Sequence, residues 1–179
     1  MKLQLEYPYI LDGNRGIQSV RDVSDYLTFG PWIYLVPQYK PKSVLLLGYG
    51  GGTAVGLMQL FYGKDLPITA VDIADCSDLN FYDIEIIQAD AEEYVKTCDF
   101  YDTIIVDVYG DEGLEPPDFI YSKEFVDNVT AKCNYLIVDA TEKSNMKHYK
   151  KLHKVKTLAL NQNRIHYFMI NEIPSLPIR

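Results

Sequence analysis

The residues best suited to chemistry are a run of glycines that follows one apolar segment and an acid that follows the next. Residues 44–47 (VLLL) lead into a glycine turn, residues 48–53 (GYGGGT), and residues 68–71 (ITAV) precede Asp72. Glycines let the backbone reverse in conformations that other residues avoid, and they bring a ligand close to the main chain. An acid at the end of the next strand lies where a ribose would bind. The pattern predicts a nucleotide site that suits either dinucleotide redox chemistry or S-adenosyl group transfer.

Two further acids follow predicted strands. Asp90 comes after residues 84–88, and Asp107 comes directly after residues 103–106. In an open parallel sheet the ligand binds beyond the carboxyl ends of the strands, so we expect these acids to lie beside the glycine turn and Asp72. The alternative for Asp72 and Asp90 is that each only caps the helix that follows it.

The elements that position these residues alternate between strand and helix. The periodicity predicts a β-hairpin in residues 1–20, a helical region interrupted at Gly30-Pro31, and a series of strands and helices from residue 44 onward. The helix between the second and third strands has room for only a turn or two. The expected strands are residues 44–47, 68–71, 84–88, 103–106, 135–138, 155–160 and 165–170, and the expected helices follow the glycine turn, Ala91, the N-cap Ser122 and the N-cap Ser144.

This order predicts an α/β fold with a Rossmann-like, doubly wound and mostly parallel sheet. An antiparallel hairpin at the end of the chain favours a sheet of the class I methyltransferase type over the redox type, and a short β-hairpin precedes it. We expect two regions: residues 1–40 with the N-terminal hairpin and helices, and residues 41–179 with the Rossmann-like nucleoside-binding domain.

Composition excludes several classes of protein. The chain has 179 residues, a net charge of -8 and three cysteines without a CxxC pair, so neither a disulfide framework nor a zinc site is predicted. No apolar stretch approaches the roughly 20 residues of a membrane span, and we expect a cytoplasmic protein without a metal or a membrane partner. The negative charge disfavours nucleic acid and suits a cationic ligand. The six lysines of residues 143–156 are interpreted as a solvated helix face that continues into a strand.

Further segments match a known pattern in chain order. Near the start stand Leu11-Asp12-Gly13, Gln18, Asp22 and Tyr26, and after the glycine turn come Val71-Asp72-Ile73, residues 89–95 (ADAEEYV), residues 101–107 (YDTIIVD), Pro116-Pro117 and Glu124-Phe125. Together they resemble the spermidine synthases, polyamine aminopropyltransferases of the class I S-adenosylmethionine-dependent methyltransferase superfamily. The resemblance covers most of the chain.

The resemblance implies a role for each matched residue. Asp107 corresponds to the catalytic aspartate, which accepts or orients a proton of the attacking amine. Asp72 is expected to accept the ribose hydroxyls, and Asp90 the adenine amino group. The acceptor is expected near Gln18, Tyr26, Tyr109 and Asp111, where acidic neighbours would hold the far end of a polyamine. The complete set expected to bind the nucleoside is Gly48, Gly50, Gly51, Gly52, Thr53, Asp72, Ile73, Asp90 and Ala91.

Three functions are compatible with these residues. The first is transfer of an aminopropyl group from decarboxylated S-adenosylmethionine to a polyamine, by a protein that the resemblance implies to be a homodimer. The second is methyl transfer from intact S-adenosylmethionine, which Thr53 tolerates because no acid is then needed to bind the donor's amine. The third is a noncatalytic nucleoside-binding protein. A dehydrogenase is less compatible, because Asp90 and Asp107 would have no role in it.

Overall fold

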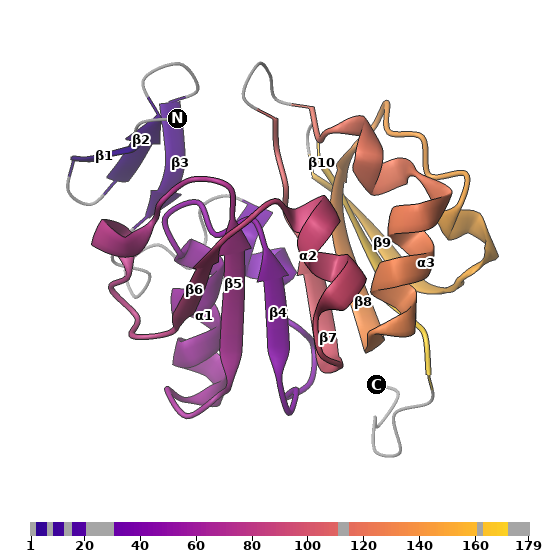
Figure 1. The fold of residues 1–179 in the computed structure, drawn as a ribbon, viewed down its shortest axis with the longest axis horizontal. Coiled ribbons are helices and arrows are strands. Elements are labelled where there is room, and N and C mark those ends of the chain that lie inside the picture. Colours follow the sequence, from indigo (N-terminus) through magenta and orange to yellow (C-terminus); the bar gives the residue numbers. More distant parts are fainter. Residues whose placement is uncertain are drawn as a thin grey trace.

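The computed structural model describes residues 3–6, 9–12, 16–20, 31–110, 115–160 and 163–171, the first three segments by their backbone alone. Its largest element is a seven-stranded sheet in the order β6-β5-β4-β7-β8-β10-β9 (Figure 1). Strands β4 to β8 run parallel, and β10 pairs antiparallel with both β8 and β9. The predicted fold class, including its antiparallel terminal hairpin, is therefore confirmed. The strands are β4 (Val44–Leu47), β5 (Ile68–Asp72), β6 (Glu85–Gln88), β7 (Tyr101–Val106), β8 (Cys133–Thr141), β9 (His153–Leu160) and β10 (Asn163–Met169).

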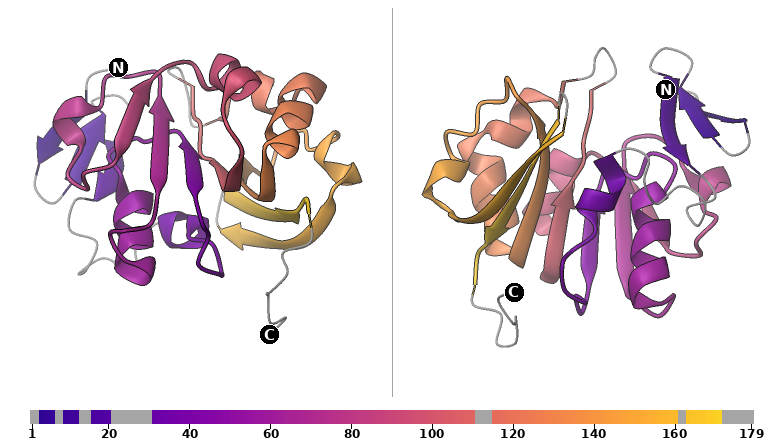
Figure 2. Two further views of the ribbon diagram at one scale, coloured as in Figure 1. Left: turned by 60° about the horizontal axis from the view of Figure 1, so that its bottom comes forward. Right: turned by 180° about the vertical axis from the view of Figure 1, so that it is seen from behind.

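Helices cover both faces of the sheet because alternate residues of its apolar strands point to opposite sides. Leu46 and Ile105 pack with α1 (Thr53–Tyr62) and η1 (Pro31–Leu35), whereas Leu45 and Ile104 pack with α2 (Ala91–Thr97) and α3 (Lys123–Ala131). Figure 2 shows the two layers from two sides. Three short 3-10 helices complete the described elements: η2 (Ser77–Leu79), η3 (Asp118–Tyr121) and η4 (Tyr149–Lys151).

The N-terminal segment contains the predicted hairpin, as β2 and β3, and one further strand. Strands β1 (Leu3–Glu6), β2 (Tyr9–Asp12) and β3 (Gly16–Val20) make a separate antiparallel sheet in the order β1-β2-β3. The further strand, β1, is separated from β2 in the sequence by Pro8, and proline cannot donate a hydrogen bond to a strand ladder. The helical region predicted after Val20 lies, up to Gly30, outside the described residues.

The helix predicted from Ser144 is wrong. Residues 142–148 form turns, and the Ser144 hydroxyl accepts a hydrogen bond from the Thr141 amide at 2.8 Å, so it stabilises a turn instead of capping a helix. A helix here would place Lys143, Lys147 and Lys151 four residues apart on one face, where like charges repel. The lysines of residues 143–156 are all exposed, as predicted, but they lie on these turns, η4 and the edge strand β9.

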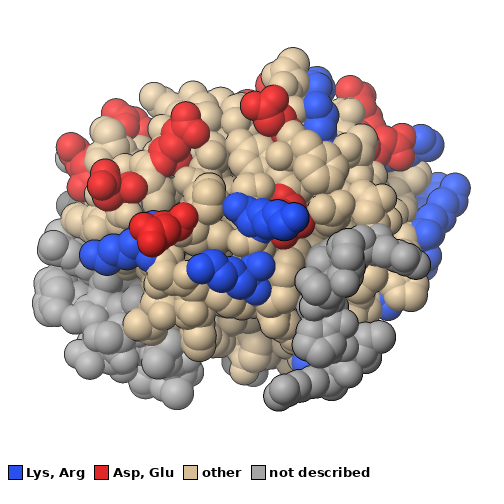
Figure 3. Space-filling view, turned by 90° about the horizontal axis from the view of Figure 1, so that it is seen from below, with Lys and Arg blue, Asp and Glu red and all other residues tan. Residues whose placement is uncertain are grey.

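The face of the molecule seen from below the view of Figure 1 carries acidic and basic side chains together (Figure 3). Cys76, Cys98 and Cys133 are free and buried, as expected for thiols without a disulfide role.

Within the described part of the chain, no helix is long and apolar enough to cross a membrane. The same part holds no group of three or more histidine, cysteine or acidic side chains placed to bind a metal ion.

Candidate functional site

The glycine turn needs its glycines for both conformation and space. Gly48, Gly50 and Gly52 have φ angles of 91°, 57° and 82°, in the left-handed region that other residues rarely adopt. A Cβ atom on Gly48 would lie 2.1 Å from the main-chain oxygen of Asp107, and one on Gly52 would lie 2.5 Å from the Tyr49 hydroxyl oxygen. The turn is therefore packed closely against the main chain that follows β7 and against the Tyr49 side chain.

Asp72 holds the glycine turn in place. Its Oδ2 atom accepts hydrogen bonds from the amides of Tyr49 at 2.9 Å and Gly50 at 3.0 Å, and its Oδ1 atom accepts one from the Ala74 amide at 2.9 Å. A carboxylate offers about four acceptor positions, so these bonds occupy about three of them. The sequence places Asp72 correctly at the end of β5, but its described contacts are to the turn itself.

Tyr49 supports the turn from below, a role that the sequence did not reveal. Its side chain is only 3% exposed, and its hydroxyl donates a hydrogen bond to the Leu79 carbonyl in η2 at 2.8 Å. The Cys76 thiol lies 3.7 Å from the Gly50 carbonyl oxygen. The short segment between β5 and β6 thus contains only η2 in place of a long crossover helix, and its residues contact the glycine turn.

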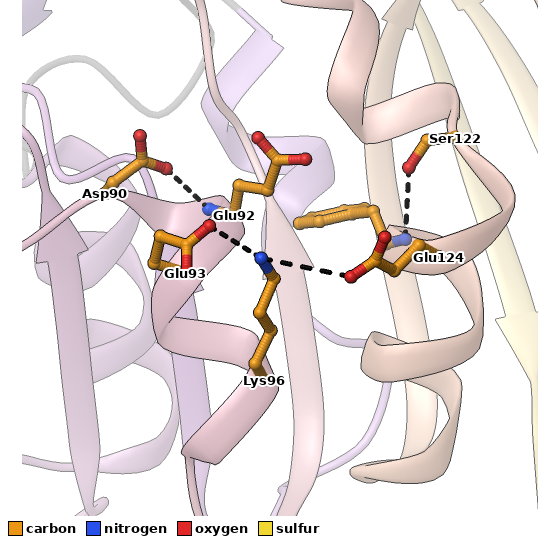
Figure 4. Close-up of polar contacts among 7 residues, drawn as sticks. Asp90, Glu92, Glu93, Lys96, Ser122 and Glu124 are labelled. Carbon is orange, nitrogen blue, oxygen red and sulfur yellow. Dashed lines mark hydrogen bonds and ion pairs between the residues drawn. The ribbon is translucent and has the colours of Figure 1, made fainter.

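Asp90 is the N-cap of α2. Its Oδ1 atom accepts a hydrogen bond from the Glu92 amide at 2.7 Å, as Figure 4 shows. The capping role that was weighed as the alternative is therefore present, although the exposed carboxylate retains acceptor positions for a second partner. Figure 4 also shows Lys96 between Glu93, at 2.6 Å, and Glu124 of α3, at 3.9 Å, so one cation links the two helices.

Asp107 lies in a cluster of polar side chains at the ends of β7, β8 and β10. It is hydrogen-bonded to Asp139, a residue of β8 that is 1% exposed. Asn163 donates from Nδ2 to both carboxylate oxygens of Asp139, at 3.1 and 2.9 Å, and to the Tyr109 hydroxyl at 3.1 Å. We call Asp107 and Asp139 the carboxyl pair.

Burial and mutual repulsion shift the acidity of this cluster. Desolvation, followed by the charge of Asp139, raises the pKa of Asp107 well above its ordinary value. Desolvation also raises the pKa of Asp139 to about 6, while hydrogen bonds from Asn163 and Tyr109 oppose the shift. Titratable groups perturbed in this way are frequent at functional sites.

No protein-family model matches the sequence, and no curated protein matches it either. Solved structures do. Human methyltransferase-like protein 13 in complex with SAH superposes with a TM-score of 0.58 and 18% identity, over 82% of both chains. The chain has the Rossmann-like methyltransferase fold.

Two more structures with this fold differ in reaction. A Burkholderia thailandensis 1,6-didemethyltoxoflavin-N1-methyltransferase, solved with S-adenosylhomocysteine, matches with a TM-score of 0.58 and 12% identity over 85% of this chain and 82% of its own. A probable spermidine synthase from Corynebacterium glutamicum matches with a TM-score of 0.58 and 19% identity over 74% of this chain and 57% of its own. At these identities the comparison establishes the methyltransferase fold and leaves the reaction to the site.

In this methyltransferase fold the predicted nucleoside residues gather at the carboxyl edge of β4, β5 and β6. Thr53 begins α1 and is buried, as is Ala91 at the start of α2, whereas the Ile73 side chain is 64% exposed. Of the predicted acceptor residues, Tyr109 belongs to the cluster around the carboxyl pair. The side chain of Gln18 and the whole of Tyr26 and Asp111 lie outside the described residues.

Asp139 and Asn163 are the polar residues that the sequence prediction missed. A signal for Asp139 was present: residues 136–139 (LIVD) repeat the pattern of residues 104–107 (IIVD), an apolar run that ends in aspartate. The pairing of Val106 with Val138 brings the two aspartates together. No comparable signal identifies Asn163, because its place depends on the antiparallel register of β10 with β8.

Proposed function

We propose that the chain binds an S-adenosyl nucleoside and acts as an S-adenosylmethionine-dependent methyltransferase. The observation that carries the proposal is the link between the glycine turn and Asp72, which places main-chain groups and a carboxylate at the carboxyl edge of a methyltransferase-type sheet. Two methyltransferases that share the fold were solved with S-adenosylhomocysteine (SAH) bound. A donor bound at this edge would meet the carboxyl pair at its reactive end.

The geometry suggests how the nucleoside would be bound. Asp72 has about one acceptor position left, so we expect it to bind one ribose hydroxyl, one fewer than the sequence suggested. Ile73, exposed beside it, offers an apolar surface to the adenine. Asp90 would accept from the adenine amino group, and the amide of Ala91, in the first turn of α2, lacks a partner within the helix.

Methyl transfer requires few contacts to the donor beyond those that bind its nucleoside. The lone pair of the acceptor attacks the methyl carbon, and the carbon–sulfur electrons return to sulfur, which loses its positive charge. Thr53 stands where an aminopropyltransferase would need an acid to bind the donor's amine, so intact S-adenosylmethionine is the better fit. Asp107, at the end of β7, is the residue that we expect to receive the acceptor's proton.

Aminopropyl transfer to a polyamine is the second candidate. It is favoured by the carboxyl pair, which suits a cationic amine, and by the probable spermidine synthase among the structural neighbours. The two candidates share the nucleoside site and differ in the donor's substituent on sulfur.

Isothermal titration with four nucleosides tests the proposal: S-adenosylmethionine, S-adenosylhomocysteine, decarboxylated S-adenosylmethionine and methylthioadenosine. We expect S-adenosylmethionine and S-adenosylhomocysteine to bind, and a labelled methyl group to reach a member of an amine panel in the wild type but not in Asp107→Asn. Binding of the decarboxylated donor alone, with conversion of putrescine to a heavier polyamine, would establish the second candidate. Absence of heat with all four nucleosides would refute both.

A further inference from the structure

The parallel register of two strands brings two carboxyl groups together at the carboxyl edge of the sheet. Val106 of β7 pairs with Val138 of β8, so the next residues, Asp107 and Asp139, project from neighbouring strands on the same face of the sheet. Their side chains are hydrogen-bonded to each other, and Asp139 is 1% exposed. Two adjacent carboxyl groups, of which Asp139 is buried and Asp107 is partly exposed, ionise together only at a high cost, so we expect them to hold one proton between them.

The surrounding donors identify which aspartate is the carboxylate. Asn163 donates to both oxygens of Asp139, and the Tyr109 hydroxyl also hydrogen-bonds to this group. Donors on both oxygens, with no acceptor for a proton of its own among them, favour the ionised form of a carboxyl group. Asp107 must then be the partner that carries the proton and donates it to Asp139.

We propose that Asp139 is a positioning residue for the transfer reaction: it shares one proton with Asp107 and makes the carboxyl pair a relay for the proton that the acceptor loses. The inference rests on the proposed function and extends it, because it assigns the acceptor to compounds that release a proton on transfer, amines above all. It also gives a role to a residue that lies behind Asp107 and does not touch the acceptor.

The step is balanced in atoms and charge. The acceptor nitrogen forms a bond to the donor carbon, the carbon–sulfur bond breaks, and its electron pair neutralises the sulfonium. The nitrogen's proton passes to Asp107 while the proton of Asp107 passes to Asp139. The carboxyl pair begins with one negative charge and ends neutral, so it has the capacity for the one proton that the reaction releases.

The groups that face the carboxyl pair favour retention of the shared proton. Asp72 reaches it from β5, Tyr109 from the segment after β7, Tyr121 from η3 and Tyr167 from β10. Asp72 adds a like charge, and the donors Asn163 and Tyr109 act on the charge of Asp139, so a second negative charge on Asp107 is disfavoured. We therefore expect the pair to titrate in two separated steps, the second above the ordinary range of an aspartate.

Carboxyl carbon chemical shifts in the protein labelled at aspartate test the sharing directly and need no donor or acceptor. In the wild type we expect two aspartates that titrate above the others, Asp139 near 6 and Asp107 higher. In Asp139→Asn, the pKa of Asp107 should fall by roughly one unit or more, because the repulsion is removed. Asp65→Asn, at an exposed position, is the matched control and should leave the titration of Asp107 unchanged. An unchanged pKa of Asp107 in Asp139→Asn would overturn the proposal.

Asn163→Ala keeps the test decisive if Asp139→Asn does not fold. Loss of its amide donor should raise the pKa of Asp139 above the value of about 6 that holds with the donor in place. If the pKa of Asp139 stays the same, the assignment of Asp139 as the carboxylate fails. Titration with S-adenosylmethionine is carried out in parallel. Absence of donor binding would refute the proposed function alone, whereas the pKa changes of Asp107 and Asp139 test the shared proton independently.

Relay through Asp139 has its own kinetic signature once an acceptor is known. The apparent pKa in the pH dependence of kcat should move in Asp139→Asn in step with the Asp107 pKa seen by chemical shift, and Asp139→Glu should restore part of the wild-type profile. A variant that only perturbs packing would lower kcat without moving the profile, and that result would count against the relay.

Discussion

The main-chain oxygen of Asp107 occupies the space that a Cβ atom on Gly48 would take, at 2.1 Å. Gly48 follows β4 and begins the glycine turn, while Asp107 follows β7 and belongs to the carboxyl pair. The Asp107 amide also donates to the Leu47 carbonyl at 2.8 Å, so a hydrogen bond joins the two segments beside the contact. The donor-binding turn and the proton-accepting group are therefore positioned by one backbone contact.

Replacement of Gly48 by alanine should consequently damage both parts of the site. A Cβ atom 2.1 Å from a main-chain oxygen cannot be accommodated without a shift of β4 against β7. We expect a loss of roughly 3 kcal/mol in the free energy of unfolding, together with loss of S-adenosylmethionine binding. Urea denaturation and isothermal titration measure the two effects.

Gly63→Ala is the matched control. Gly63 has a φ angle of 92°, close to the 91° of Gly48, but nothing lies within 4 Å of the position that its Cβ would take. With ψ at 158° its backbone is in a region used almost only by glycine, so its substitution should cost the conformational strain alone, about 1–3 kcal/mol, and leave donor binding intact. Equal losses in the two variants would show that the contact between Gly48 and Asp107 has no energetic consequence.

Tyr49→Phe tests the support below the glycine turn. The change removes the hydroxyl that donates to the Leu79 carbonyl and leaves a buried acceptor without its partner, at a cost of about 1–3 kcal/mol. Because Tyr49 packs under Gly52, we expect weaker donor binding as well. Thermal unfolding and titration calorimetry are the measurements, and Tyr34→Phe, at a side chain that is 39% exposed, should change neither.

The central strands could be predicted from the sequence because their physics is local. Residues 44–47 and 104–106 are continuous apolar runs, as strands covered on both faces must be, and acids or glycine follow them at the carboxyl edge. Asp72, Asp90 and Asp107 were found by this rule. The confirmed N-cap Ser122, which accepts from the Phe125 amide at 3.1 Å, is equally local.

The features that were missed depend on contacts between distant segments. Tyr49 meets Leu79 across 30 residues, and Asn163 meets Asp139 across 24, so no window of sequence displays either pair. The helix wrongly predicted from Ser144 was also decided by a contact with a distant segment. A serine followed by apolar and basic residues resembles a helix start, but the Tyr121 hydroxyl lies 2.5 Å from the Ser144 hydroxyl and helps to hold it in a turn.

Asp90 has two roles that substitution can separate. Serine is also a good N-cap, so Asp90→Ser should preserve α2 and the free energy of unfolding while it removes the carboxylate expected to bind adenine. We expect roughly tenfold weaker binding of S-adenosylmethionine, about 1.4 kcal/mol, by titration calorimetry. Asp90→Ala should lose the donor affinity and about 1 kcal/mol of stability together. Unchanged affinity in Asp90→Ser would leave Asp90 as a helix cap alone.

The carboxyl pair predicts an unusual pH dependence of stability. Folding raises the pKa of Asp139 to about 6 and that of Asp107 further, so the protonated forms are favoured in the folded state. The stabilisation from this linkage is complete below the unfolded value near 4 and is lost as the pH rises through 6 and above. In Asp107→Asn the amide can still donate to Asp139 but cannot ionise. The variant should therefore match the wild type at pH 4 and exceed its free energy of unfolding by roughly 1–3 kcal/mol at pH 8.

Urea denaturation of both proteins between pH 4 and pH 8 measures this difference. Comparison within one pH series cancels the contribution of the chain's other charges, which the two proteins share. Asp65→Asn changes the net charge by the same amount at an exposed position, so its curve should run parallel to that of the wild type. If the Asp107→Asn curve is parallel as well, folding does not raise the pKa of Asp107, and the two aspartates do not hold a proton between them.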